Sequence, residues 1–208
     1  MMALLRLRTL RSLLFKGGRM NFDIQELLKF KIKGDNDDIR FKEIIKEKLL
    51  NNEKIIYVLN NKELEDNDAE VDEYFGVNIL PYYMVPGTQH NTQNFICYEV
   101  SFEEEARYNK VIKYGQIIFY ILCEEKTVIE EATGIARQDL LGALIIEQFN
   151  WSNFFGNQIH LISDRPSVVD NHYPCRTLIF EGQFTNSISK TKDGSSMVIN
   201  NWGKNGST

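Results

Sequence analysis

The pattern of apolar and polar positions is most regular in the second half of the chain. Apolar side chains occupy every second position from Ile96 to Phe102, with Glu99 and Ser101 between them. This alternation predicts a strand with one buried face. Residues 114–124 (YGQIIFYILCE) are apolar on both faces, which predicts a central strand covered on both sides. Residues 103–113, between the two, suit a hairpin connection.

The strongest helix prediction falls on residues 134–151 (GIARQDLLGALIIEQFNW). Apolar side chains recur at helical spacing from Ile135 to Phe149 and form a wide stripe, and the polar residues mostly lie off it. Two further strands are predicted after this helix. The first is short and covers residues 157–164 (NQIHLISD), and the second is longer and covers residues 174–184 (PCRTLIFEGQF).

The first third of the chain is predicted to be helical. Residues 22–30 and 35–52 carry apolar side chains near the 3.6-residue period, and Asp35–Asp38 form an acidic cap region before the second helix. Residues 53–61 (EKIIYVLNN) predict a short helix or strand. The acidic stretch 63–76 (ELEDNDAEVDEYFG) predicts a surface loop.

Two prolines define the next stretch, residues 78–93. Pro81 and Pro86 fix their φ angles and lack a backbone donor, so they disfavour a hydrogen-bonded ladder. The stretch is predicted to be an extended, ordered connector rather than a paired strand.

These elements together predict an α+β fold, with a mainly antiparallel four-stranded sheet and helices packed against it. Four segments follow from the same pattern. Residues 1–19 are a leader, 20–70 a helical N-terminal region, 71–187 the α+β core domain and 188–208 a polar tail. The tail is rich in glycine and serine, so we expect it to be mobile or ordered only by a neighbour.

Charge is unevenly distributed along the 208 residues. The first 20 residues hold five basic groups and no acid, and the remainder holds 19 basic and 29 acidic side chains, a net charge of −10. An acidic body disfavours generic binding to a nucleic-acid backbone. Leu and Arg alternate in residues 1–19, as in an organellar presequence. Lys16–Met20 can instead be encoded with AGGAGG before a start codon, which predicts Met20 as the natural start; a genuine basic arm is the rival interpretation.

Cysteine usage indicates the redox compartment of the protein, and hydropathy indicates whether it could span a membrane. Cys97, Cys123 and Cys175 are odd in number and widely spaced, without a CxxC pair, which favours a reducing compartment and thiols used as small apolar side chains. No apolar run reaches the roughly 18 residues needed to span a bilayer. We therefore expect no membrane partner.

One short motif could carry chemistry. Glu124 and Lys126 form an E-x-K at the end of the predicted central strand, as in Mg²⁺-dependent nucleases of the restriction type. Such a site needs a second carboxylate, and Glu99, Glu103 or Glu105 are the candidates. Charged residues also cluster wherever strands emerge into solvent, which is the commoner explanation.

Other catalytic or ligand-binding patterns are not evident. The three histidines, His90, His160 and His172, lack metal-ligand spacing, and Asp170 with His172 reads more simply as a polar turn. There is no nucleophile elbow and no glycine-rich phosphate loop. We expect no catalytic residue, no metal and no cofactor.

Aromatic side chains gather around the predicted turns and have two interpretations. The first is core packing and loop anchoring. The second is contact with a partner protein, because aromatic side chains and methionine are enriched at interface centres. Arg137 and Asp139, at the start of the predicted helix, are candidate charges for a subunit contact. The aromatic and methionine candidates are Tyr82, Tyr83, Met84, Trp151, Phe154 and Phe155.

The order of the predicted elements and several short sequence segments within residues 94–187 resemble those of the tail-terminator and neck proteins of tailed bacteriophages. The resemblance rests on NFICYEV, GQIIFYILCE, the helix segment 134–151, GNQIHLISD and YPCRTLIFEGQF. It implies a small antiparallel sheet with helices against it, and hexameric rings that cap the tail tube and dock to head-completion or connector proteins. It also implies a virion protein that is assembled in the bacterial host cytoplasm, lies near DNA in the ring lumen and has no catalytic residues.

The helical region before about Glu70 is longer than a minimal tail terminator needs. A different neck or head-completion protein is therefore the nearest alternative. The alternative from a different class is the nuclease that would use Glu124 and Lys126.

Overall fold

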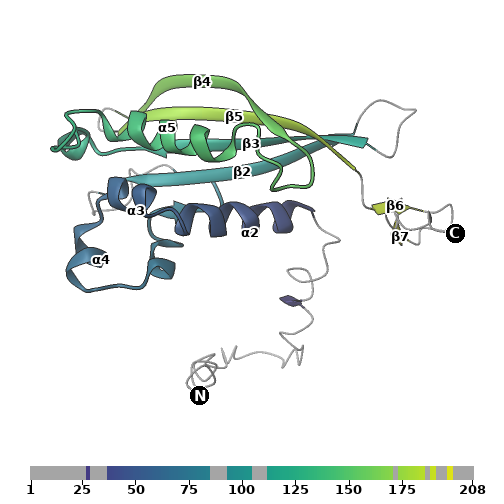
Figure 1. Ribbon diagram of the computed structural model, residues 1–208, viewed down its shortest axis with the longest axis horizontal. Coiled ribbons are helices and arrows are strands. Elements are labelled where there is room, and N and C mark those ends of the chain that lie inside the picture. Colours follow the sequence, from purple (N-terminus) through teal and green to yellow (C-terminus); the bar gives the residue numbers. More distant parts are fainter. Residues whose placement is uncertain are drawn as a thin grey trace, which may run out of the picture.

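A five-stranded sheet backed by helices forms the main body of the protein (Figure 1). The computed structural model describes residues 27–28, 37–84, 93–104, 112–170, 173–185, 188–190 and 196–198. Residues 1–19, and with them both interpretations of the leader, lie outside this range. Leu27 and Leu28 are helical, within the helix predicted for residues 22–30.

The strands follow the order β1-β2-β3-β5-β4 across the sheet. β1 pairs with β2 in parallel, and the other neighbours are antiparallel. The strands are β1 (Ile79–Leu80), β2 (Phe95–Glu104), β3 (Ile112–Leu122), β4 (Ile159–Asp170) and β5 (Tyr173–Thr185).

The α+β class is confirmed, but the prediction of four antiparallel strands is wrong by one strand. Ile79 and Leu80 pair with Ile96 and Cys97, although we expected an unpaired connector there. Pro81 follows directly and lacks a donor, which explains why this strand is only two residues long.

The edge strand β4 is longer than the predicted strand 157–164 and continues through Pro166 to Asp170. A proline is tolerated because β4 pairs on one side only. Its register shifts between Leu161 and Ser163, and again between Val168 and Asp170. Such bulges and prolines limit pairing of an edge strand with other chains.

The helices of the described residues mostly follow the predicted pattern. The stretch 53–61 is helical rather than extended, because Asn52 caps it by accepting a hydrogen bond from the Ile55 N–H and Asn60 ends it with φ 51°. Short helical turns replace much of the acidic loop predicted at 63–76. The helices are α2 (Asp37–Leu50), α3 (Glu53–Leu59), α4 (Lys62–Asp66) and α5 (Arg137–Phe149), with 3₁₀ turns η1 (Val71–Tyr74) and η3 (Glu125–Thr127).

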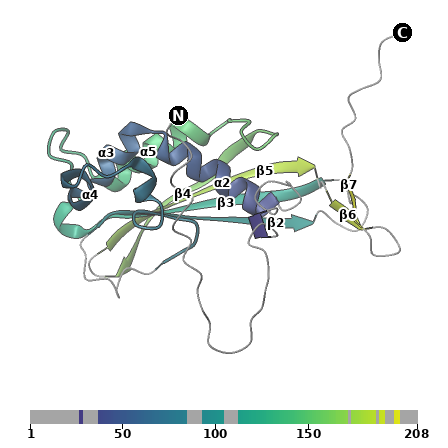
Figure 2. The same cartoon turned by 90° about the horizontal axis from the view of Figure 1, so that it is seen from below.

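One hydrophobic core joins the predicted N-terminal region to the predicted α+β domain. Figure 2 shows α2, α3 and α5 on the same side of the sheet. Phe41, Ile45 and Leu49 of α2 are fully buried there, as is Phe149 of α5. The inward alternation predicted for Ile96–Phe102 is confirmed, because these side chains pack in this core.

Two glycines make room for large rings within this core. A Cβ on Gly115 would lie 2.7 Å from the Phe184 ring and 2.8 Å from the Phe102 ring. A Cβ on Gly182 would lie 2.9 Å from both the Phe184 ring and the Gln158 carbonyl oxygen. The strands therefore need glycine at these two positions, where the rings pass close to the backbone. Phe41 packs edge-on against both rings, at centroid distances of 5.2 and 4.9 Å.

A second, smaller cluster lies on the opposite face of the sheet. All three cysteines are free and buried, as expected for thiols used as apolar side chains. Burial raises the pKa of Cys97 to about 11 and that of Cys123 to about 12, so both thiols are protonated at neutral pH. The smaller cluster on the opposite face of the sheet consists of Leu80, Phe95, Cys97, Leu122, Tyr173 and Cys175.

The predicted tail contains a small ribbon. β6 (Ile188–Lys190) and β7 (Ser196–Val198) pair with each other as a separate two-stranded sheet.

Candidate functional site

The second face of the sheet is the main surface left without a helix in the described part of the chain. Its middle carries the outward side chains of β2, β3, β5 and the start of β4, because register places them on the face opposite the helices. We expected β3 to be covered on both sides, but on this side only its Leu122 end is buried and Ile118 is half-buried. We call this surface the open face; it comprises Glu99, Ser101, Gln116, Ile118, Tyr120, His160, Thr177, Ile179 and Glu181.

The predicted contact residues Tyr82, Tyr83 and Met84 lie together at one end of the open face. Tyr82 is 53% exposed, and the Tyr83 ring packs on Tyr120 with centroids 4.6 Å apart. Burial raises the pKa of Tyr120, and the negative charge of Glu99, to which the Tyr120 hydroxyl donates over 3.5 Å, raises it further. Met84 packs against the second cluster.

Trp151 lies at the other end of the open face. The residue is 63% exposed, and its ring stacks on His160 with centroids 5.6 Å apart and an interplanar angle of 21°. His160 pairs with Glu181, which pairs with Gln116, four positions along β3 from Tyr120. Four residues span about 13 Å of a strand, so aromatic side chains flank the open face at both ends.

Phe154 and Phe155, also predicted as contact residues, belong to the core. Phe155 is 2% exposed and packs on Phe41 at 4.7 Å. Phe154 is half-buried and meets the Phe149 ring edge-on at 6.1 Å, with the Lys48 ammonium 4.2 Å from its centroid. For these two residues the core-packing interpretation holds.

Arg137 is buried, which corrects its prediction as a charge at a subunit contact. Its Nε donates to the Thr127 carbonyl over 2.9 Å and one terminal nitrogen donates to the Val58 carbonyl over 3.1 Å. The side chain therefore ties the start of α5 to the end of α3.

Asp139 is exposed, but it is engaged within its own chain. It accepts a hydrogen bond from Arg176 over 2.6 Å, and Arg176 also binds Asp164 through two nitrogens at 2.8 and 2.6 Å. This ion-pair cluster links α5, β5 and β4. The contacts with Asp164 are the main cause of the raised pKa of Arg176.

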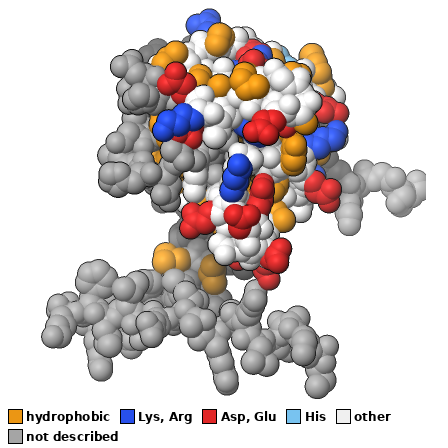
Figure 3. Space-filling view, turned by 90° about the vertical axis from the view of Figure 1, so that its left-hand side faces the viewer, with side chains coloured by type: hydrophobic (Ala, Val, Ile, Leu, Met, Phe, Trp, Pro, Cys, Tyr) orange, Lys and Arg blue, Asp and Glu red, His pale blue; other side chains and the backbone are white. Residues whose placement is uncertain are grey.

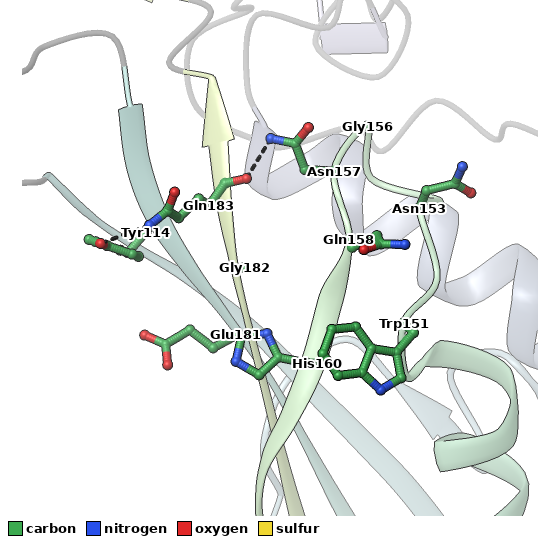
Figure 4. A pocket seen from close by; sticks show the side chains of 10 residues that line it. All are labelled: Tyr114, Trp151, Asn153, Gly156, Asn157, Gln158, His160, Glu181, Gly182 and Gln183. Carbon is green, nitrogen blue, oxygen red and sulfur yellow. Dashed lines mark hydrogen bonds between the residues drawn. The ribbon is translucent and has the colours of Figure 1, made fainter.

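A groove opens beside Trp151 at this end of the open face (Figure 4). It has a volume of about 860 Å³ and lies between the sheet and the loop that joins α5 to β4. Figure 4 shows the Trp151 ring beside His160, with Glu181 close by on the next strand. We call it the Trp151 groove; it is lined by Tyr114, Trp151, Asn153, Gly156, Asn157, Gln158, His160, Glu181, Gly182 and Gln183.

The predicted E-x-K pair is not accompanied by the expected second carboxylate. Glu124 is 6% exposed, whereas Lys126 is exposed. Glu99 pairs with Ile118 of β3. Ile118 lies six positions before Glu124, and six residues of extended chain span about 20 Å. Glu103 lies farther along β2, and Glu105 lies outside the described residues. Within the described ranges, no three His, Cys, Asp or Glu side chains are grouped as metal ligands would be.

A buried chain of asparagines supports this end of the sheet and was not anticipated from the sequence. Asn61 donates to Asn78 over 2.7 Å, and Asn78 donates to the Asn94 carbonyl over 2.9 Å. The Asn94 side chain donates to the Leu59 carbonyl over 2.9 Å and accepts from the Glu124 N–H over 3.1 Å. The only available signal was the frequency of asparagine near predicted breaks, which usually indicates turns.

The end of the molecule that carries α4 is strongly acidic (Figure 3). Residues 62–74 include seven acidic side chains and one lysine. This agrees with the acidic body expected from the sequence. Among the described helices, none combines the length and the apolar character needed to cross a bilayer.

The fold and its surfaces define an α+β protein with a five-stranded mixed sheet, helices on one face and an open second face. The family model YomW matches residues 52–181, which is more than half of the chain. The chain therefore belongs to the YomW family, a Bacillus phage-like protein family, and this associates it with bacteriophage. No curated protein matches the chain.

Proposed function

We propose that this chain is a structural protein of the phage head–tail junction, and specifically a tail terminator. In this proposal, six copies form a ring that caps the tail tube, and the ring docks to the head-completion or connector proteins. The protein is then part of the virion and is assembled in the host cytoplasm.

The open face is the observation that carries the proposal. It combines half-buried apolar side chains with exposed aromatic rings at both ends, and none of the described helices covers it. In a ring, one surface of each subunit contacts a different surface of the next subunit. The open face would therefore pack against another kind of surface on its neighbour. Tyr82, Tyr83 and Trp151 are the side-chain types that most often anchor such contacts.

The net charge of the chain also supports a ring through which DNA passes. From residue 21 onward the chain has a net charge of −10. Negative surfaces repel nucleic acid, so they would let DNA move through a ring without adhering to its wall.

The test uses purified full-length protein, alone and mixed with tail tubes from the phage that carries the gene. Native mass spectrometry measures the subunit number, and electron microscopy locates the protein. We expect a ring of about six subunits at one end of the tube. A chain that stays monomeric in the presence of tubes would contradict the proposal. A ring that binds isolated head connectors but not tubes would assign it to another neck position.

A further inference from the structure

The Trp151 groove shares His160 and Glu181 with the open face, and in the unassembled subunit it has features of a binding site for a small ligand. Trp151 adopts φ 61°, a left-handed conformation that is unusual for a large side chain. The backbone N–H of Trp151 donates to the Ile159 carbonyl over 2.8 Å, and the backbone N–H of Ile159 donates to the Ser152 carbonyl over 3.1 Å. Such conformations persist where the surroundings fix them, and they concentrate at functional sites.

The indole is also fixed in orientation. It stacks nearly parallel to His160, and 63% of its surface remains accessible. A ring held in this way loses little conformational freedom when a ligand covers it, which favours binding. The groove therefore has a flat apolar platform on one side.

Polar groups complete the lining. Asn157 donates to the Gln183 carbonyl over 2.6 Å, and the Gln183 amide donates to the Tyr114 hydroxyl over 2.9 Å, which orients these side chains. The Glu181 carboxylate and the Asn153 amide make no hydrogen bond to another described side chain. Amides donate and accept, and a carboxylate accepts at two oxygens, so together they suit ligands with several hydroxyl groups.

The composition of the groove argues against other ligand classes. Among the described residues that line it there is no lysine or arginine, and Glu181 adds a negative charge, so this part of the lining disfavours phosphates and nucleic acids. Apart from the aromatic rings its lining is mostly polar, so an apolar peptide or a lipid chain would leave polar groups unpaired. Its 860 Å³ falls in the range of about 300–1,000 Å³ typical of small-molecule sites.

We propose that the Trp151 groove binds a neutral oligosaccharide. One sugar ring stacks its C–H face on the free face of the indole and bonds to Asn153 and Gln158, and a neighbouring ring of the same oligosaccharide bonds to Glu181. This ligand class combines an apolar ring face with vicinal hydroxyls, which are the two features that the groove complements.

The test exploits the presence of only two tryptophans, Trp151 and Trp202. In full-length protein carrying Trp202→Phe, Trp151 is the only indole fluorophore. Maltotetraose, cellotetraose and tetraacetylchitotetraose are titrated up to about 10 mM, which covers weak binding. We expect a saturable change of Trp151 emission with at least one of them, and calorimetry on the unmodified chain should give the same dissociation constant.

Variants assign the binding to the groove. Trp151→Ala should weaken saccharide binding measured by calorimetry at least about tenfold, because it removes the aromatic platform. Tyr82→Ala is the matched control, since this exposed ring lies at the opposite end of the open face. Asn153→Ala should also weaken binding, and it provides a second test if Trp151→Ala fails to fold by circular dichroism.

Three outcomes overturn the assignment. The first is the absence of a saturable response to all three saccharides. The second is equal binding by the wild type and the Trp151→Ala and Asn153→Ala variants. The third is stronger binding of a short single-stranded oligothymidylate that weakens with salt, because this would identify a charged ligand. Failure of ring formation leaves this proposal standing, since its readout needs only the folded chain.

Discussion

Arg176 determines how closely helix α5 can approach the sheet. Its guanidinium is held by Asp139 and Asp164, and its aliphatic stem passes directly beneath Gly142. A Cβ at Gly142 would lie 2.9 Å from Arg176 Cδ and 3.0 Å from Nε. Glycine in the middle of a helix costs about 1 kcal/mol relative to alanine, so its presence here reflects this close contact.

The Gly142→Ala variant should be less stable than the wild type, by roughly 1–3 kcal/mol, because overpacking forces α5 or Arg176 to move. The measurement is urea unfolding followed by circular dichroism. In an Arg176→Ala background the sign should reverse, since alanine then gains up to about 1 kcal/mol from helix propensity without a clash. An equal effect of Gly142→Ala in both backgrounds would show that Arg176 is not the obstacle.

Glu130 is a second residue with a distinct role, because it closes the turn before α5. Its carboxylate accepts from the Thr133 hydroxyl at 2.7 Å and N–H at 2.8 Å, from the Ala132 N–H at 3.1 Å and from the Tyr57 hydroxyl at 3.2 Å. The hydrogen bond from the Thr133 side chain is the main cause that lowers the pKa of Glu130 to about 2.

This lowered pKa predicts a pH-dependent contribution to stability. An unfolded glutamate has a pKa of about 4.3, so the contribution is complete above that value and is lost as the pH falls toward 2. Glu130→Gln should therefore reduce stability most near pH 7, and its difference from the wild type should shrink below about pH 4.3. Urea unfolding at pH 7, 5 and 3 measures this. The exposed neighbour variant Glu131→Gln is the control, and a difference that is constant with pH would contradict the assignment.

At the scale of elements, the asparagine chain joins helices to the end of the sheet. Asn61 caps α4 by accepting from the Leu64 N–H, and it also reaches Asn78 beside β1. Asn94 then connects the start of β2 with the end of α3 and with Glu124, two residues after β3. These contacts bridge 16 to 35 positions in the sequence, so no local pattern could predict them.

Asn94→Ala should destabilise the protein by roughly 2–4 kcal/mol. It leaves the Leu59 carbonyl and the Glu124 N–H without these partners in a buried site, and each such group costs about 1–3 kcal/mol. Denaturant midpoints measure the change. Asn67→Ala removes one exposed hydrogen bond to the Glu63 carbonyl and should change stability by no more than about 0.5 kcal/mol. Equal effects of both variants would argue against the network.

At the scale of the whole molecule, periodicity predicted most of the architecture. The pairing of β2 with β3 and the packing of α5 follow from strong alternation and from a wide apolar stripe. The parallel strand β1 escaped prediction because two residues before a proline carry no period. The open face escaped it for a different reason. Ile118 and Ile179 are apolar, so the sequence alone could not show that helices cover only the other side of their strands.

The contact residues were only partly predictable, for a related physical reason. Trp151 and Phe155 lie four residues apart in the same aromatic segment, yet one is 63% exposed and the other is 2% exposed. Their exposure depends on the left-handed backbone at Trp151 and on the packing of Phe155 against Phe41, which only the tertiary structure specifies. Residue type therefore located the segment, and the fold decided which of its rings faces outward.

The open face yields the most direct test of assembly. Ile118 and Ile179 pair across β3 and β5 in its centre, where both are half-buried. If this face meets a neighbouring subunit, Ile179→Lys places a charge in the contact and should weaken association at least about tenfold. The isolated subunit should stay folded, because lysine at a half-buried position can extend its ammonium into water.

Ile129→Lys is the matched control, since Ile129 is 52% exposed and lies in the turn before α5, away from the open face. Sedimentation velocity and native mass spectrometry of both variants, with and without tail tubes, measure the subunit number, and circular dichroism confirms folding. We expect rings for the wild type and Ile129→Lys, and folded monomers for Ile179→Lys. Rings of normal stability from Ile179→Lys would place the subunit contact elsewhere, and the acidic α4 end would be the next surface to test.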